Sequence, residues 1–316
     1  MFSTRWRKVV RELWSNRTRT MLVIASIDVG IFAVGTVQLL GSIILSELKV
    51  IYAETNVAQA VVFTNGVDQD QLDAIGRMRE VADVQGRSTL PLKVQTKPDK
   101  QETLLVTSID DFNDIRINRI QPIYSLPSKP AVGTEQTAWP QKDEIVIERS
   151  GFNSATALPA GLAVGDKLTL QNQDDRPREV TLSGVVYDPN GFSANFTGQA
   201  TGYVDLDTFE RLGGARTFQQ VLVRVNGTPE QLLDKEYITS IANKVADKIE
   251  KGGYTVARVQ VPEPGKLALQ DLFDALALLL TPLGLLALIL SGFLVINTIS
   301  ALMAQQVRQI GVMKAV

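Results

Sequence analysis

The stretch that decides the fold class is ALALLLTPLGLLALILSGFLVINTISALM, from Ala275 to Met303, which contains no charged residue. A second apolar run, from Met21 to Leu45, contains a single charge, that of Asp28. Each run exceeds the roughly 20 residues that a helix needs to cross about 30 Å of hydrocarbon. Water-soluble helices seldom lack a charged face over such a length. We therefore predict a membrane α-helical protein with two transmembrane helices in this chain, at 21–46 and, together with a stalk, at 269–303.

The distribution of charge predicts the orientation. Basic residues dominate the first 20 positions, where Glu12 is the single acid, and the tail after Met303 carries Arg308 and Lys314 without an acid. Cytosolic flanks of membrane helices carry such an excess of Lys and Arg. Both ends are thus expected in the cytosol and residues 47–268 on the other side. A cleaved secretory signal fits the first run less well, because a signal core is shorter.

Residues 1–20 predict an amphipathic helix at the cytosolic membrane interface. At 3.6 residues per turn, Trp6 and Trp14 fall on one side, and Arg5, Lys8 and Arg11 fall on the other. Tryptophan suits the headgroup layer and the cations suit an anionic leaflet, so membrane lipid is an expected partner. The segment is either a simple topology anchor or an elbow helix ahead of the first span.

Residues 47–268 alternate strand and helix patterns, which predicts a large extracytoplasmic α+β domain. Strands are predicted at 59–64, 103–109, 144–148, 167–170, 180–187, 202–206, 221–225 and 254–261, and helices at 70–79, near 207–212 and within 229–251. A proline-rich stretch between Pro122 and Pro140 interrupts the pattern. We predict an inserted β-rich subdomain at 125–200 between α+β flanks at 55–124 and 201–262.

Composition argues against catalysis. The chain contains no histidine and no cysteine, which excludes a Ser-His-Asp arrangement, most zinc sites and a disulfide framework. The acidic pairs Asp110-Asp111 and Asp174-Asp175 are hard-cation ligands in one interpretation, and solvated turn residues in the commoner one. No Walker motif and no GxGxxG occurs. No catalytic residue, cofactor, metal site or nucleic-acid partner is predicted, and any ATP hydrolysis belongs to another chain.

Three polar residues fall within the apolar runs. Asp28 is the one charge there, and ionisable groups at that depth are functional candidates by default. A proton relay needs further titratable groups, which neither run supplies. Asn297 and Thr298 are predicted at a similar depth, so Asp28 is expected to hydrogen-bond there or across a dimer.

Both flanks carry a family pattern. Trp14-Ser15-Asn16-Arg17-Thr18-Arg19-Thr20-Met21-Leu22 resembles the segment that leads into the first span of MacB/FtsX-like ABC transporter permeases. Val307-Arg308-Gln309-Ile310-Gly311-Val312-Met313-Lys314-Ala315-Val316 is similar to the family's segment after the second span. Gln309 stands where the family commonly has glutamate. Between the flanks, the turn at 165–168 and the strand at 183–188 resemble the family's β-rich insertion.

The resemblance implies a function without an active site. The chain would be a permease subunit in a bacterial inner membrane, coupling ATP hydrolysis by a cytosolic ABC ATPase to movement of its extracytoplasmic domain. The residues that would contact the ATPase are Gln305, Val307, Arg308, Gln309, Ile310, Gly311 and Lys314. A second permease copy or homologue and an extracytoplasmic adaptor would be further partners. Family members continue with two more spans, so a fragment, a truncated product or half of a split permease is expected.

Two other classes compete with this interpretation. A two-span membrane receptor with an extracytoplasmic sensing domain has the same topology, but it needs an output module after the second apolar run. A membrane-tethered hydrolase needs an active site, for which the sequence supplies no residues.

Overall fold

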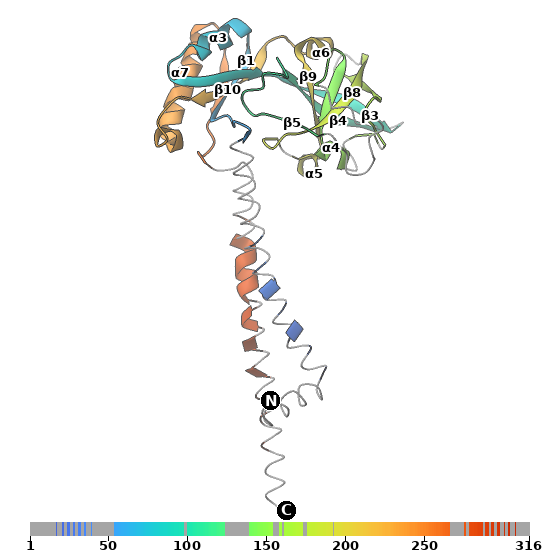
Figure 1. Cartoon of the computed structure of the whole chain (residues 1–316), viewed down its shortest axis with the longest axis vertical. Helices are drawn as coiled ribbons and strands as arrows, with labels where there is room; N and C mark the ends of the chain where they lie inside the picture. The colour runs from blue at the N-terminus through green and yellow to red at the C-terminus, as the bar shows by residue number, and fades with distance from the viewer. Residues whose placement is uncertain are drawn as a thin grey trace, which may run out of the picture. The chain divides into compact units, whose positions relative to one another are not determined.

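The computed structural model describes residues 54–97, 100–123, 139–153, 158–159, 161–172, 176–191 and 193–265, together with scattered residues of 17–39 and 275–307 (Figure 1). The chain divides into two compact units. One consists of Val50–Ala268, and the other combines Met1–Lys49 with Leu269–Val316. All strands and the helices α3 to α7 belong to the first of these units.

The predicted fold class requires a correction. No helix formed by the described residues is both long and apolar enough to cross a membrane. Most residues of the predicted spans at 21–46 and 269–303 lie outside the described part. The fold that the structure describes is therefore an α+β domain, and the prediction of a membrane α-helical fold with two transmembrane helices was wrong.

A four-stranded antiparallel sheet forms the first half of this domain, in the order β11-β1-β10-β2. Its strands are β1 (Ala60–Val67), β2 (Val81–Arg87), β10 (Phe218–Val225) and β11 (Val256–Gln260). The helices α3 (Gln69–Gly76) and α7 (Lys235–Lys251) pack against the sheet and close one hydrophobic core with it (Figure 1). A short 3-10 helix, η1 (Gln231–Leu233), leads into α7.

The sequence of α7 explains its position on the sheet. The side chain of Asp234 caps the helix by accepting hydrogen bonds from the amides of Glu236 and Tyr237. The buried side chains recur at helical spacing and are Ile238, Ile241, Ala242, Val245, Ala246 and Ile249. Lys248 and Lys251 lie in the last turn, where the helix dipole favours positive charge.

The second sheet has seven strands, in the order β5-β8-β6-β9-β4-β3-β7. Its strands are β3 (Thr89–Lys97), β4 (Lys100–Ile109), β5 (Gln121–Ile123), β6 (Glu144–Glu148), β7 (Lys167–Gln171), β8 (Pro177–Tyr187) and β9 (Ala200–Asp205). Because β7 pairs with β8 as well as with β3, the sheet closes on itself around a second core. Three short helices accompany it: α4 (Ser150–Asn153), α5 (Ala194–Thr197) and α6 (Leu206–Arg211).

The second sheet takes its strands from a wider range than the predicted insertion at 125–200. Its first strand begins at Thr89, separated by Ser88 alone from β2 of the first sheet, and its last strand ends at Asp205. Ser88 ties the two sheets together, since its hydroxyl donates to the carbonyl of Thr217 and its amide donates to the hydroxyl of Ser108. β3 and β4, placed in a flank by the sequence pattern, are thus part of the inserted sheet.

The domain is entered and left at one place. β1 and β11 are neighbouring antiparallel strands, with Val61 opposite Gln260. Since β1 is the first strand and β11 the last, the start of β1 and the end of β11 lie side by side. Everything between them, including the whole second sheet, is inserted between these two neighbouring strands.

Candidate functional site

A polar cleft lies beside α3, at the edge of the first sheet. It has a volume of about 290 Å³. Its walls come from α3, from β2 and from the loop that follows β4, so segments distant in sequence meet there. The side chain of Asp68 caps α3 by accepting from the amide of Gln71, and this fixes the helix beside β2.

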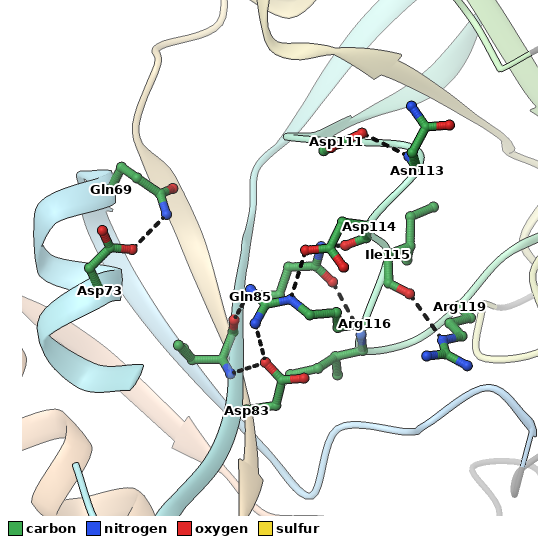
Figure 2. Close-up of polar contacts among 12 residues, drawn as sticks. Gln69, Asp73, Asp83, Gln85, Asp111, Asn113, Asp114, Ile115, Arg116 and Arg119 are labelled. Carbon is green, nitrogen blue, oxygen red and sulfur yellow. Dashed lines mark hydrogen bonds and ion pairs between the residues drawn. The ribbon is translucent and has the colours of Figure 1, made fainter. Parts of the chain in front are cut away.

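The loop after β4 covers the outer edge of β2. The side-chain amide of Gln85 is both a donor and an acceptor towards this loop (Figure 2). Its Nε2 donates to the carbonyl of Asp114 at 3.2 Å, and its Oε1 accepts from the amide of Ile117 at 3.2 Å. Arg116 donates to the carbonyl of Val84 at 3.2 Å and pairs with Asp83 at 2.7 Å. An open strand edge is a template for unwanted pairing. These contacts close the edge with side chains in place of another strand.

Acidic groups dominate the cleft. Asp73, Asp110, Asp111 and Asp114 line it together with Arg77 and Arg116. Burial raises the pKa of Asp110, and the neighbouring charge of Asp111 raises it further, whereas Arg216 and Arg116 lower it. Asp114 pairs with Arg116 at 3.2 Å, and Asp73 accepts from Gln69 at 2.9 Å (Figure 2).

The residues that line the cleft can hydrogen-bond to a polar or cationic group. Among the described residues, no group of three or more acidic side chains is arranged to hold a metal ion. The cleft contains no hydroxyl or amine nucleophile beside a base. Of the two acidic pairs noted in the sequence, Asp110-Asp111 borders this cleft, and Asp174-Asp175 lies outside the described residues.

A second set of polar groups is buried between the two sheets. Arg87, at the end of β2, donates to the carbonyls of Ile117 at 2.9 Å and Asn118 at 2.7 Å. Burial lowers the pKa of Arg87, while the charges of Asp188 and Tyr203 raise it. For the Tyr203 phenol, whose charged form is the deprotonated one, burial raises the pKa well above its ordinary value. The side chains of Arg87, Tyr203 and Asp188 are at most 8% exposed, so this network lies inside the protein and has a structural role.

Few of the site residues predicted from the sequence are described. Asp28, Asn297 and Val307 are helical and exposed, and the described contacts include no hydrogen bond between Asp28 and Asn297. The other predicted site residues lie outside the described part: Thr298, Gln305, Arg308, Gln309, Ile310, Gly311 and Lys314. Their roles in polar packing and in ATPase contact remain predictions.

The sequence pattern did not reveal the residues of the cleft as a set. Neither Gln85 nor Arg116 belongs to a recognisable sequence motif. They are 31 positions apart in the sequence, and the fold brings them together at the cleft. Only the adjacency of Asp110 and Asp111 was visible beforehand.

The chain is similar to solved structures with which it shares little sequence identity. The extracellular domain of the noncanonic ABC-type transporter YknZ from Gram-positive bacteria is 12% identical, and the match covers 63% of this chain and 100% of that chain with a TM-score of 0.39. The periplasmic region of MacB from Actinobacillus actinomycetemcomitans is 11% identical, with coverages of 66% and 91% and a TM-score of 0.38. No family model and no curated protein matches the chain.

These neighbours are extracytoplasmic domains of ABC-type transporters. The flanking segments of this chain resemble the same class of protein. The predicted resemblance is confirmed in that respect.

Proposed function

We propose that the chain is a membrane-associated permease component of an ABC-type transporter, with its Val50–Ala268 unit outside the cytosol. A separate cytosolic ATPase would supply the energy, and a second permease copy would complete the assembly. The chain itself would perform no catalysis, in keeping with a sequence that contains no histidine and no cysteine.

The observation that carries this proposal is the pairing of the first strand with the last. Val61 opposite Gln260 fixes the start and the end of the domain next to each other. A domain inserted in this way between two segments of one chain receives any displacement of those segments at a single end. Its hydrogen-bonded strands and its core would then move as one body, because packed interiors deform little. A domain that is driven from one end needs this arrangement.

The sequence after the domain supports the cytosolic part of the proposal. Arg308, Gly311 and Lys314 lie in the segment that resembles the ATPase-facing segment of MacB/FtsX-like permeases. We expect this segment to bind the ATPase surface and to follow its closure on ATP.

The test is capture of an ATPase by the tagged full-length chain. The chain is co-expressed with each ABC ATPase of its own genome, and the captured protein is identified by mass spectrometry. We expect one ATPase to co-purify with the wild type and to be lost from Arg308→Glu and Gly311→Trp. Arg258→Glu, an exposed change on β11, is the matched control and should retain it. Failure of the wild type to retain any of the ATPases would overturn the proposal.

A further inference from the structure

A second cavity lies where the domain begins and ends. It has a volume of about 220 Å³ and lies between the residues before β1, the start of α7 and the residues after β11. Much of its wall is apolar, from Val57, Leu232, Ile238, Pro262 and Pro264. The rest of the wall is largely polar, and β10 contributes a permanent cation to it, Arg224.

The guanidinium of Arg224 is only partly satisfied by the protein. Its Nη1 donates to Oδ1 of Asn56 at 2.7 Å. Its Nε is buried and has no acceptor, and no carboxylate forms an ion pair with Arg224 in the described part of the chain. A buried donor without a partner is unfavourable, and such groups call for an explanation.

Two carboxylates in the neighbourhood of Arg224 bind other groups. Asp83 lies directly opposite Arg224 in the pairing of β10 with β2, but its Oδ1 pairs with Arg116 and also accepts from the amide of Val84. Glu263 lines the cavity and forms an ion pair with Lys235. The positive charge of Arg224 is therefore not neutralised by an acid at the cavity.

The chemistry of the remaining guanidinium nitrogen identifies the ligand class. With Nη1 bound to Asn56 and Nε buried, Nη2 is the guanidinium nitrogen left to bind a ligand, and its charged N–H groups are suited to an oxygen of a carboxylate or phosphate. The apolar wall suits a hydrocarbon group attached to that anion. We propose that this cavity binds an anionic amphiphile, an oxyanion on an apolar stem, through Arg224. This inference does not depend on the transporter proposal.

The test is calorimetric titration of the full-length chain in an uncharged detergent. The probes are dihexanoyl phosphatidic acid, dihexanoyl phosphatidylcholine and inorganic phosphate. We expect the phosphatidic acid to bind at least tenfold more tightly than either of the others. Inorganic phosphate binding as tightly would overturn the role of the apolar wall, and phosphatidylcholine binding as tightly would overturn the role of the charge.

Variants assign the binding to Arg224. Arg224→Gln should weaken the binding of phosphatidic acid at least tenfold, and Arg224→Lys should weaken it less, because lysine keeps the positive charge but not the planar guanidinium. Asn56→Asp places a carboxylate on Nη1 and should also weaken binding while it preserves the local hydrogen bond. Arg258→Gln, which removes a charge that stacks on Phe63 at 4.3 Å outside the cavity, should bind as the wild type does. Unchanged affinity in both Arg224→Gln and Asn56→Asp would overturn the proposal.

Discussion

Tyr203 on β9 donates its buried hydroxyl to Oδ2 of Asp188, at 2.5 Å, just beyond the end of β8. Tyr203 is 3% exposed and Asp188 is 8% exposed, so neither group has much access to water. The charge of Asp188 acts on Arg87, which in turn donates to the carbonyls of Ile117 and Asn118. The hydrogen bond therefore lies in the network that joins the inserted sheet to the four-stranded one.

We expect Tyr203→Phe to destabilise the protein by about 1–3 kcal/mol, because the buried Oδ2 of Asp188 loses the hydrogen bond from Tyr203. Urea denaturation of the full-length chain measures the change. Tyr254→Phe is the matched control, since the Tyr254 hydroxyl bonds Asp68 at 2.6 Å in a more accessible position. Tyr254→Phe should lower the free energy of unfolding clearly less. Equal losses in the two variants would show that burial does not strengthen the contribution of the Tyr203 hydrogen bond.

Gln85 is predicted to protect the open edge of β2. Gln85→Glu replaces the donor that bonds Asp114 with a charged acceptor, beside a loop that already carries Asp110, Asp111 and Asp114. We expect a loss of about 1–3 kcal/mol and faster hydrogen exchange at the amide of Ile117. Exchange monitored by NMR checks the local effect, and the amide of Val223, paired inside the same sheet, is the internal reference. Unchanged exchange at Ile117 would contradict the role assigned to Gln85.

The sequence predicted those strands whose pattern is regular. β6 has the predicted bounds, Glu144–Glu148, and the helix predicted within 229–251 is present as α7, beginning only after its cap at Asp234. β2 and β3 were missed, since Gly86 and Pro91 interrupt them. Pro91 is tolerated because β3 has only β4 beside it there, while β7 pairs further along, at Lys93 and Val94.

The polar cleft and the Arg224 cavity were beyond the reach of sequence patterns for a different reason. Each is assembled from segments that are distant along the chain, and only the strand order brings them together. Arg224 and Asn56 are separated by 168 positions and meet through the pairing of β1 with β10. A single sequence contains no periodic signal for such a contact, whereas alternation within one strand is local and visible.

Position 86 is predicted to accept no residue larger than glycine without a loss of stability. A Cβ at this position would overlap the ring of Phe218 and approach Leu72 at 2.7 Å. We expect Gly86→Ala to destabilise the domain by about 1–3 kcal/mol, the usual range for overpacking. In the double variant with Phe218→Leu, the smaller side chain should make room, so the two losses should sum to more than the loss in the double variant. Urea denaturation of all four proteins measures the coupling, and strict additivity would mean that the ring is not what excludes a side chain here.

The last prediction concerns the titration of Asp110. Its pKa lies above the ordinary value of 3.8, first because of burial and then because of Asp111, and Arg216 acts in the opposite direction. Asp111→Asn should therefore lower the pKa of Asp110, and Arg216→Gln should raise it. Carbon-13 NMR of the aspartate carboxyls across pH 2.5 to about 7, spanning roughly the model carboxyl range, measures both shifts. Shifts of the same sign in the two variants would contradict the assigned electrostatics.

The raised pKa of Asp110 also predicts how the free energy of unfolding changes with pH. Because the folded pKa of Asp110 is raised, the folded state binds more protons than the unfolded state between the two pKa values. The contribution of Asp110 is thus fully present below the unfolded value of 3.8 and is lost as the pH rises through the folded value. Asp110→Asn removes this group, so the difference in urea midpoint between variant and wild type should shift in favour of the variant as the pH rises through that window. Asp111→Asn should produce a smaller change in the same direction, because it removes only one of the causes.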